Sequence, residues 1–200
     1  MLRDLTIGGC HLNENDAVLG ILQTDACLSM MNNKNLIEFR HVIFRDNRNR
    51  GGSLLFVNDP ACYKFDMQHV LFQSNQYMLQ SQLSSLNDLM NVTLIKNEPF
   101  EDSSASASMF GLPPVSDTAV SHVTAEDNAG TLFQLEEAAI AIQNSNFSRS
   151  SACGMGVILA NASDVSISAS AFDSNDCNGS HAVRIQGSAE SSSNDKSVKI

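Results

Sequence analysis

The sequence contains no tryptophan, only two tyrosines and few charged residues, which make up 17% of its 200 positions. Basic residues are especially scarce: 12 Lys and Arg stand against 22 Asp and Glu, for a formal net charge of −10. Nucleic-acid binding requires a surface that neutralises phosphates, and docking on anionic membranes requires clusters of Lys and Arg. The composition therefore argues against nucleic acid and against anionic membranes as partners.

Long apolar segments are also missing. A membrane-spanning helix needs about 20 consecutive apolar residues, and the chain has no such run. The opening residues MLRDLTIGG lack the apolar core of a signal peptide. We therefore expect no membrane insertion by this segment, whose length suits a single domain over residues 1–200.

The sequence does contain an internal repeat. Each copy spans eleven residues. Apolar residues occupy positions 1 and 3, a small or apolar residue position 6, an apolar or aromatic residue position 8, and an asparagine position 11. IEFRHVIFRDN from Ile37 and FDMQHVLFQSN from Phe65 are clear copies. Seven copies occur 22 to 32 residues apart, and Ser150 replaces the asparagine of the sixth. The terminal asparagines are Asn15, Asn47, Asn75, Asn97, Asn128 and Asn175.

This pattern predicts short strands that turn one face inward, because apolar residues alternate with other residues. Short strands that recur at this spacing are typical of a parallel β-solenoid, in which each coil stacks on the next at about 4.8 Å. Equivalent positions then form ladders. The asparagines predict a ladder at a turn, where Asn tolerates left-handed backbone and side-chain amides bond between coils. The predicted fold is all-β: a right-handed parallel β-helix of about seven coils.

A leucine-rich repeat, which also carries a regularly spaced asparagine, is the competing interpretation. Its order L-x-x-L-x-L-x-x-N is not kept here, and no helical segment follows each strand. We therefore favour the β-solenoid.

The motif F-x-x-N, as in FRDN, FQSN and FDSN, precedes a glycine-led apolar strand such as GGSLLF from Gly51. This combination resembles the repeats of polymorphic outer-membrane proteins, and it is similar to right-handed parallel β-helix domains in general. The likeness extends over nearly the whole chain. The resemblance implies an extracellular or surface-displayed protein with a role in display or adhesion, and it carries over no catalytic residue.

Two segments interrupt the repeat. Residues 98–114 hold three of the four prolines, and residues 188–195 read SAESSSND. Both are predicted to loop out of the stack, either as tolerated insertions or as binding loops. Val198 and Ile200 repeat the start of a further coil, and neither end shows a polar capping segment. We therefore expect the chain to be a fragment of a longer β-helix.

The five cysteines have neither zinc-finger nor Cys-x-x-Cys spacing, and their odd number leaves at least one thiol unpaired within the chain. Cys153 and Cys177 follow the terminal positions of consecutive copies by three and two residues. Stacking would bring them within reach of a disulfide bond. Cys10 occupies a core position and is expected to be buried as a small apolar residue.

Alignment of the copies predicts a column of acidic residues on the outer face. Glu38, Asp66 and Asp88 lie between the first two apolar residues of three consecutive copies, and Arg40 shares the face of Glu38. Carboxylates about 5 to 10 Å apart can bind calcium or act in glycoside hydrolysis. Pectate lyases, which have a similar β-helix, place acidic calcium ligands and a basic residue on one sheet. The alternative is a solvated polar face whose repulsion is relieved by cations.

Two further groups are candidate binding residues. His41 and His69 occupy the same turn position in neighbouring copies. They could form a metal site or a pH-sensitive pair, or simply part of a polar turn ladder. Arg45, Arg48 and Arg50 lie in one turn. They could bind an acidic glycan or phosphate, or balance nearby carboxylates.

The sequence thus favours a non-enzymatic β-helix outside the cell, which acts as a structural stalk or as an adhesion surface for glycans or a cell-surface receptor. The competing hypothesis is a polysaccharide lyase or glycoside hydrolase that uses the acidic column. The first hypothesis requires no cofactor. The second would use calcium at Glu38, Asp66 and Asp88.

Overall fold

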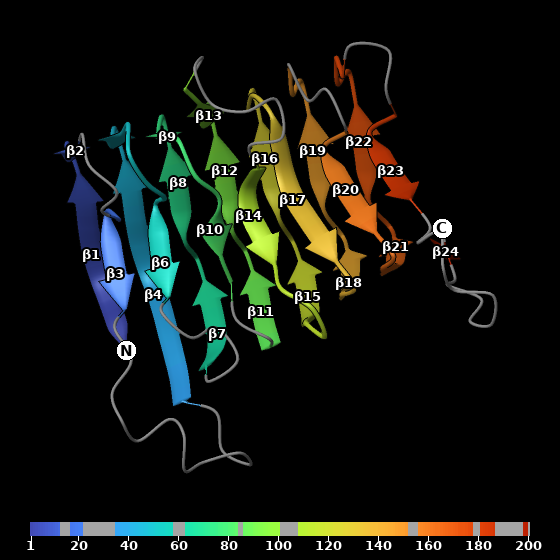
Figure 1. Cartoon of the computed structure of the whole chain (residues 1–200), viewed down its shortest axis with the longest axis horizontal. Helices are drawn as coiled ribbons and strands as arrows, with labels where there is room; N and C mark the ends of the chain where they lie inside the picture. The colour runs from blue at the N-terminus through green and yellow to red at the C-terminus, as the bar shows by residue number, and fades with distance from the viewer. Residues whose placement is uncertain are drawn as a thin grey trace.

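Short parallel strands stack side by side along one axis in the computed structural model (Figure 1). The structure describes residues 1–12, 17–21, 35–57, 63–83, 86–100, 108–151, 156–177, 181–186 and 198–199. Within these ranges the chain forms strands, turns and bends but no helix, so no described helix could cross a membrane. The predicted all-β, parallel β-solenoid fold is confirmed.

Most coils contribute two strands to a 13-stranded parallel sheet. The long strand β4 (Asn35–Arg45) joins two arms of this sheet, because it pairs with different strands along its two halves. Its neighbour β1 (Leu2–Gly8) pairs with residues of both halves. One arm continues through β7 (Tyr63–Gln68), β11 (Leu86–Met90), β15 (Asp117–Ser121), β18 (Ala139–Gln143), β21 (Asp164–Ser168) and β24 (Val198–Lys199). The other continues through β8 (Leu71–Gln73), β12 (Thr93–Ile95), β16 (Thr124–Glu126), β19 (Asn146–Ser148) and β22 (Ala171–Asp173).

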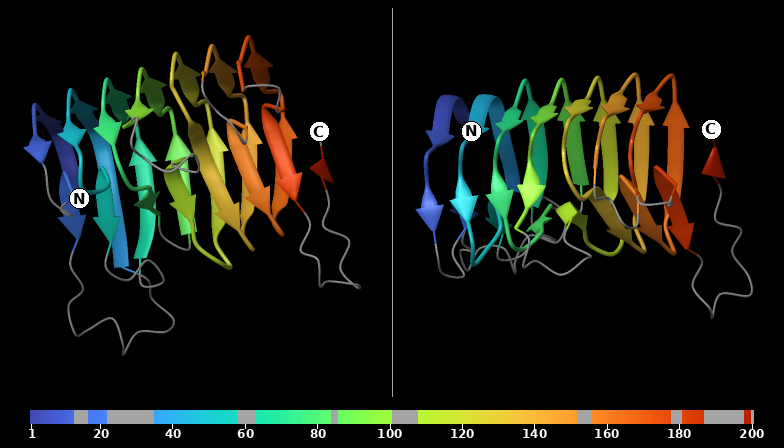
Figure 2. Two further views of the ribbon diagram at one scale, coloured as in Figure 1. Left: turned by 45° about the horizontal axis from the view of Figure 1, so that its top comes forward. Right: turned by 90° about the horizontal axis from the view of Figure 1, so that it is seen from above.

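Smaller sheets complete each coil, and Figure 2 shows them on other sides of the stack. A four-stranded sheet contains β2 (His11–Leu12), β5 (Arg48–Asn49), β9 (Gln76–Tyr77) and β13 (Glu98–Pro99). A five-stranded sheet contains β10 (Ser81–Gln82), β14 (Ser108–Leu112), β17 (Thr131–Glu136), β20 (Ile158–Asn161) and β23 (Val183–Gln186). A two-stranded ladder pairs β3 (Leu19–Ile21) with β6 (Leu55–Val57).

The solenoid has about five turns, slightly fewer than the seven coils predicted. The five-stranded sheet does not extend through the whole stack. In the first two coils the equivalent strands β3 and β6 pair only with each other. A side chain bridges the break, since the Leu55 amide donates to Ser81 Oγ at 3.0 Å.

The predicted insertion at residues 98–114 is shorter than expected. Its ends form β13 and β14, and both strands belong to the stack. The proline content suggested a loop, but β13 is the edge strand of its sheet, where Pro99 is tolerated. The remainder of the predicted insertion, residues 101–107, and the second predicted loop, 188–195, lie outside the described residues.

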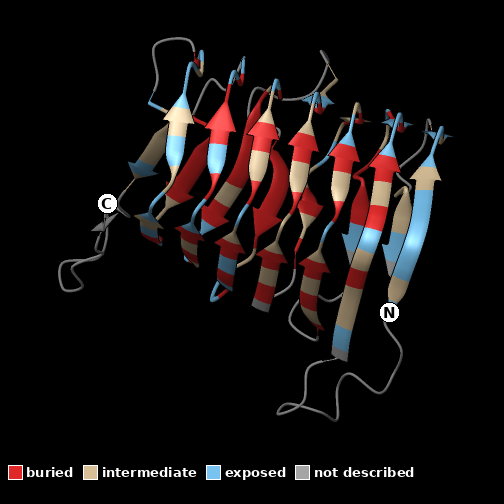
Figure 3. Ribbon diagram, turned by 180° about the vertical axis from the view of Figure 1, so that it is seen from behind, coloured by how far each residue is buried: buried red, intermediate tan, exposed pale blue. Residues whose placement is uncertain are grey.

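Inward-facing apolar residues form the core. Buried and half-buried residues alternate strictly along β7 (Figure 3), as a strand with one face inward requires. The rings of Phe44 and Phe72 stack with centroids 4.8 Å apart, and those of Phe39 and Phe65 lie 5.8 Å apart. These distances follow the spacing of neighbouring strands. The apolar ladder predicted from the repeat is therefore present.

A ladder of buried asparagines runs beside this core. The Nδ2 group of Asn47 donates to Oδ1 of Asn75 at 2.8 Å, Asn75 donates in the same way to Asn97 at 2.9 Å, and Asn97 to Asn128 at 3.0 Å. Each of these Oδ1 atoms also accepts the backbone N–H of the preceding asparagine in the ladder. Each Nδ2 group also donates to a main-chain carbonyl of the preceding coil. The buried amides are thus fully hydrogen-bonded, which ties successive coils together.

One detail of the predicted ladder is wrong. The left-handed backbone at this corner belongs to the residue before each asparagine, as at Asp46, Ser74 and Lys96, whose φ angles are 54°, 53° and 53°. The asparagine itself is not among the residues with positive φ. The corner needs the sharp turn one residue earlier because the asparagine must point its amide into the stack.

The predicted register of the first coil is also wrong. Leu5 pairs with Val42 and not with the position of Ile37, and the Cys10 amide donates to Oδ1 of Asn47 at 3.1 Å. Cys10 therefore occupies the ladder position predicted for Asn15, which lies outside the described residues. The first coil has no F-x-x-N motif. Its left-handed residues Asp4 and Gly9 (φ 51° and 69°) are what align it with the second coil.

The cysteines follow the prediction in part. Cys177 is buried and disulfide-bonded. Its predicted partner Cys153 lies outside the described residues, so that pairing stays a prediction. Cys10 is a free thiol and is half-buried, not fully buried as expected.

Removing one amide should show how much the asparagine ladder contributes to stability. Asn75→Ala leaves the Asn47 amide and the Phe44 carbonyl without their partners in a buried setting. We expect it to lower the free energy of unfolding by about 3–6 kcal/mol, since each unpaired buried group costs about 1–3 kcal/mol. Urea denaturation measures this. Asn146→Ala, at an exposed position, is the control and should change stability by less than about 0.5 kcal/mol; equal effects would contradict the ladder's role.

The ladder is incomplete at Ser150, whose buried Oγ has no hydrogen-bond partner among the described residues. Ser150→Asn would supply the missing amide between Asn128 and Asn175. We expect the free energy of unfolding to rise by about 1 kcal/mol, the usual net contribution of a hydrogen bond. The same change at the exposed neighbour Ser151 should be neutral. A lower thermal midpoint for Ser150→Asn alone would show that the position cannot hold the amide.

Candidate functional site

The acidic column predicted from the repeat exists in the structure. The parallel register aligns Glu38 of β4 with Asp66 of β7, and Asp66 with Asp88 of β11. Basic side chains lie between the carboxylates. The Nη2 atom of Arg40 donates to Oε1 of Glu38 at 3.1 Å and to Oδ2 of Asp66 at 2.9 Å. The Nζ atom of Lys64 lies 2.6 Å from Oδ2 of Asp88.

These ion pairs give the column a structural role. The hydrogen bond and the charge of Asp88 raise the pKa of Lys64 above its ordinary value. A calcium ion at this face would have to displace both Arg40 and Lys64. No cluster of three or more His, Cys, Asp or Glu side chains suited to a metal ion occurs within the described ranges. The geometry therefore does not favour a calcium-dependent site at the column.

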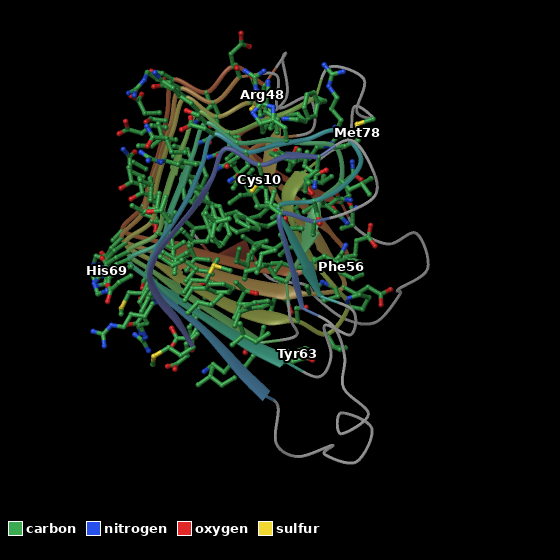
Figure 4. All side chains as sticks on the ribbon, turned by 90° about the vertical axis from the view of Figure 1, so that its left-hand side faces the viewer. Cys10, Arg48, Phe56, Tyr63, His69 and Met78 are labelled. Atoms are coloured by element: carbon green, nitrogen blue, oxygen red, sulfur yellow. The ribbon has the colours of Figure 1, made fainter. Side chains whose placement is uncertain are left out.

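The predicted histidine pair is also present. The rings of His41 and His69 are parallel and their centroids lie 5.0 Å apart. Both residues have left-handed backbone, as a turn ladder requires. The Nδ1 atom of His41 lies 3.6 Å from a carboxylate oxygen of Asp4. Both side chains are exposed, His69 lies at a corner of the stack (Figure 4), and no group of three or more side chains suited to a metal ion occurs in the described part of the chain.

The three arginines of the turn separate into two groups. Arg45 ends β4 on the outer face of the main sheet, next to Gln73 in the register. The left-handed residue Asp46 then turns the chain, and Asn47 points inward. Arg48 and Arg50 follow on another side of the coil, where both are exposed. The structure thus brings Arg48 and Arg50 together and leaves Arg45 apart.

Arg48 and Arg50 line a groove that the sequence did not reveal. One cavity of about 460 Å³ is lined by Arg48, Arg50, Gln76, Met78, Glu98, Pro99 and Phe100. A second cavity of about 510 Å³ shares Arg48, Gln76 and Glu98 with the first. We call the first cavity, with its seven lining residues, the corner groove. In a view along the stack, Arg48 and Met78 lie at one corner and His69 at another (Figure 4).

The corner groove is built from three consecutive coils. Arg48, Gln76 and Glu98 are neighbours in the parallel register of β5, β9 and β13. Each directly follows a ladder asparagine, so the buried amide holds the backbone beneath each outward side chain. Nε2 of Gln76 donates to Oε1 of Glu98 at 2.5 Å.

Arg50, Met78 and Phe100 form the second side of the corner groove. Each is the residue that follows one of the same three strands. The guanidinium carbon of Arg50 lies 5.5 Å from the centroid of the Phe100 ring, a cation–π contact. The Phe100 amide donates to the Tyr77 carbonyl at 3.0 Å, which fixes the backbone that carries the ring. An aromatic ring, guanidinium groups, an amide and one carboxylate therefore face one open cavity, a combination suited to binding a polar ligand.

An ion pair closes the far side of the second cavity. Asp127 accepts from Nε of Arg149 at 2.7 Å, and Arg149 also donates to Glu126 at 3.1 Å. The hydrogen bond from Arg149 holds the pKa of the Asp127 carboxyl below its ordinary value of 3.8. The negative charge of Asp127 is thus already balanced by Arg149.

Sequence reasoning missed most of the groove residues. Glu98 and Phe100 fell inside the predicted loop, and Gln76 and Met78 belong to no repeated pattern. A signal was present: the residue after each ladder asparagine faces outward, and in three consecutive coils it is Arg48, Gln76 and Glu98.

Comparison of the chain with protein-family models, curated proteins and solved structures finds no significant match. The resemblance to polymorphic outer-membrane-protein repeats therefore stays a prediction, and the function has to be argued from the geometry.

The pairing of Asp127 with Arg149 should be visible in an acid titration. Because the folded-state pKa of Asp127 is lowered, the pair stabilises the fold above the unfolded pKa, and this contribution disappears as the pH falls through the folded pKa. Arg149→Ala should return the pKa of Asp127 toward 3.8, as followed by NMR of the carboxyl carbon. Arg45→Ala, which removes an arginine remote from Asp127, should leave it unchanged. An unshifted Asp127 in the Arg149 variant would contradict the pairing.

Proposed function

We propose that this chain is a non-enzymatic, extracellular or surface-displayed β-solenoid that binds glycans in the corner groove and otherwise serves as a rigid stalk. The observation that carries the proposal is the groove itself. It spans three consecutive coils and combines Arg48, Arg50, Gln76, Glu98 and Phe100 in one open cavity. Polar side chains with several donors and acceptors beside an aromatic ring suit the hydroxyl groups and C–H faces of sugars.

The stacking of the coils supports the stalk role. Buried hydrogen bonds between side-chain amides link the asparagines from Asn47 to Asn128. Stacked rings such as those of Phe147 and Phe172, whose centroids lie 4.8 Å apart, continue the core. A solenoid whose neighbouring coils are joined by both kinds of ladder transmits force along its axis. It also holds the groove residues at fixed separations.

The disulfide at Cys177 supports a location outside the cell. Disulfide bonds persist in oxidising compartments and are rare in the cytosol, and Cys177 is disulfide-bonded and buried.

The acidic column gives no support to a lyase or hydrolase. Each of its carboxylates forms an ion pair with Arg40 or Lys64, which gives the column a structural role. The described residues that line the corner groove include one carboxylate, Glu98, whereas glycoside hydrolysis uses a pair. We therefore assign binding, and not hydrolysis, to the proposed site.

A glycan-binding assay tests the proposal. The protein is titrated with a panel of neutral and acidic oligosaccharides, and products are checked for new reducing ends. We expect binding without cleavage. Phe100→Ala should weaken binding about tenfold, the usual effect of removing an aromatic anchor.

Phe56→Ala is the matched control, because Phe56 is 45% exposed and lies on another side of the coil (Figure 4). It should bind as the unmodified chain does. Release of reducing ends would contradict the non-enzymatic assignment, and no binding to any member of the panel would contradict glycan binding.

A further inference from the structure

We infer that the corner groove selects acidic oligosaccharides, with Arg48 and Arg50 holding a carboxylate or sulfate group while Gln76 and Glu98 bond sugar hydroxyls. This inference rests on the proposed function and names its ligand class. It follows from four features of the groove.

The first feature is the absence of counter-charges at Arg48 and Arg50. Among the described residues, Arg40 pairs with two carboxylates, Lys64 with Asp88, and Arg149 with Glu126 and Asp127, whereas the separate cations Arg45 and Lys96 form no ion pair. Arg48 and Arg50 form no ion pair with any described residue, although the chain carries a net charge of −10. Two unpaired guanidinium groups two residues apart on one face form an attractive site for an anion.

The second feature is that the backbone of both arginines and the guanidinium of Arg50 are held in place. The backbone N–H of Arg48 donates to the Cys10 carbonyl at 2.8 Å, and that of Arg50 donates to the Leu12 carbonyl at 2.9 Å. The Phe100 ring supports the guanidinium of Arg50. The Arg50 guanidinium, which packs on this ring, loses less side-chain entropy when it forms two parallel hydrogen bonds to a carboxylate or sulfate.

The third feature is the polarity of the groove. Arg48 lies on the second coil and Glu98 on the fourth, with Gln76 between them. Glu98 repels an anion from its own end of the polar row, so the acidic group of a ligand has to lie toward Arg48, with Arg50 beside it across the groove. The Glu98 carboxylate and the Gln76 amide are then available to hydroxyl groups of the same ligand. The two ends are about 9–10 Å apart, twice the strand spacing, which exceeds one sugar ring and calls for at least a disaccharide along the solenoid axis.

The fourth feature is the apolar side of the groove. Met78, Pro99 and Phe100 also line the cavity. These surfaces can pack on the C–H face of a sugar ring, which a free phosphate or an isolated carboxylate does not possess. An extended acidic sugar therefore satisfies both sides of the groove.

The experiment titrates the full chain by calorimetry with oligogalacturonate, a heparin oligosaccharide and a neutral maltooligosaccharide of equal length. At low ionic strength we expect the acidic ligands to bind at least about tenfold more tightly than the neutral one, and this margin to shrink with added salt. The carboxylate and sulfate ligands distinguish the two sources of negative charge.

Arg48→Ala and Arg50→Ala should each weaken binding of the preferred acidic ligand about tenfold or more, as expected for loss of a charged hydrogen bond. Arg45→Ala removes the same charge from the same turn outside the groove and should change affinity by less than about twofold. Arg48→Lys keeps the charge but loses the planar fork, so it should restore only part of the affinity. Unchanged circular dichroism confirms that each variant is folded.

The failures are distinguishable. Equal binding of neutral and acidic ligands, unaffected by Arg48→Ala and Arg50→Ala, would overturn the acidic selectivity and leave the proposed glycan binding in place. Binding of an acidic peptide with no binding of any oligosaccharide would overturn both. If Arg45→Ala weakened binding of the acidic ligand as much as the groove variants do, net charge alone would explain the effect. That result would also overturn the assignment to the groove.

Discussion

The hydrogen bonds from Asn47 through Asn75 and Asn97 to Asn128 are the interaction on which the rest of the structure depends. An amide buried away from water is tolerated only when its donors and acceptor are satisfied. Each of these amides meets that condition only if the next coil lies directly above in the correct register. A slip of one residue would turn the amide outward and the neighbouring apolar residue with it. The ladder therefore selects one register for the coils it joins.

A fixed register determines which surface residues become neighbours. It aligns Glu38, Asp66 and Asp88, and this arrangement is tolerated because Arg40 and Lys64 neutralise the carboxylates. The same register places Arg48, Gln76 and Glu98 in a row just outside the ladder. The first group forms ion pairs within the chain, whereas Arg48 and its neighbour Arg50 have no carboxylate partner among the described residues. This difference between a closed ion-pair network and an unpaired cationic pair is the basis for assigning structure to one face and binding to the other.

The features that repeat along the chain could be predicted from the sequence. Period-two alternation and the recurring asparagine predicted parallel stacking, the apolar core, the acidic column and the stacking of His41 on His69. Features that depend on a single coil could not. The first coil lacks the motif, so its register was placed five residues away from the observed pairing of Leu5 with Val42. The strand β13 was not predicted because its proline indicated a loop. The groove was not predicted because ion pairs and ring contacts, such as that of Arg50 with Phe100, depend on side-chain conformation, which no repeat encodes.

Hydrogen exchange of the asparagine side-chain amides is the most direct test of the central claim. The account predicts that the Nδ2 protons of Asn47, Asn75 and Asn97 exchange only when the whole stack unfolds, since they are buried and bonded between coils. The exposed amide of Asn146 should exchange at the rate of an unstructured peptide. If the three ladder amides exchanged as fast as that of Asn146, the ladder would not hold the coils together and the register built on it would be wrong.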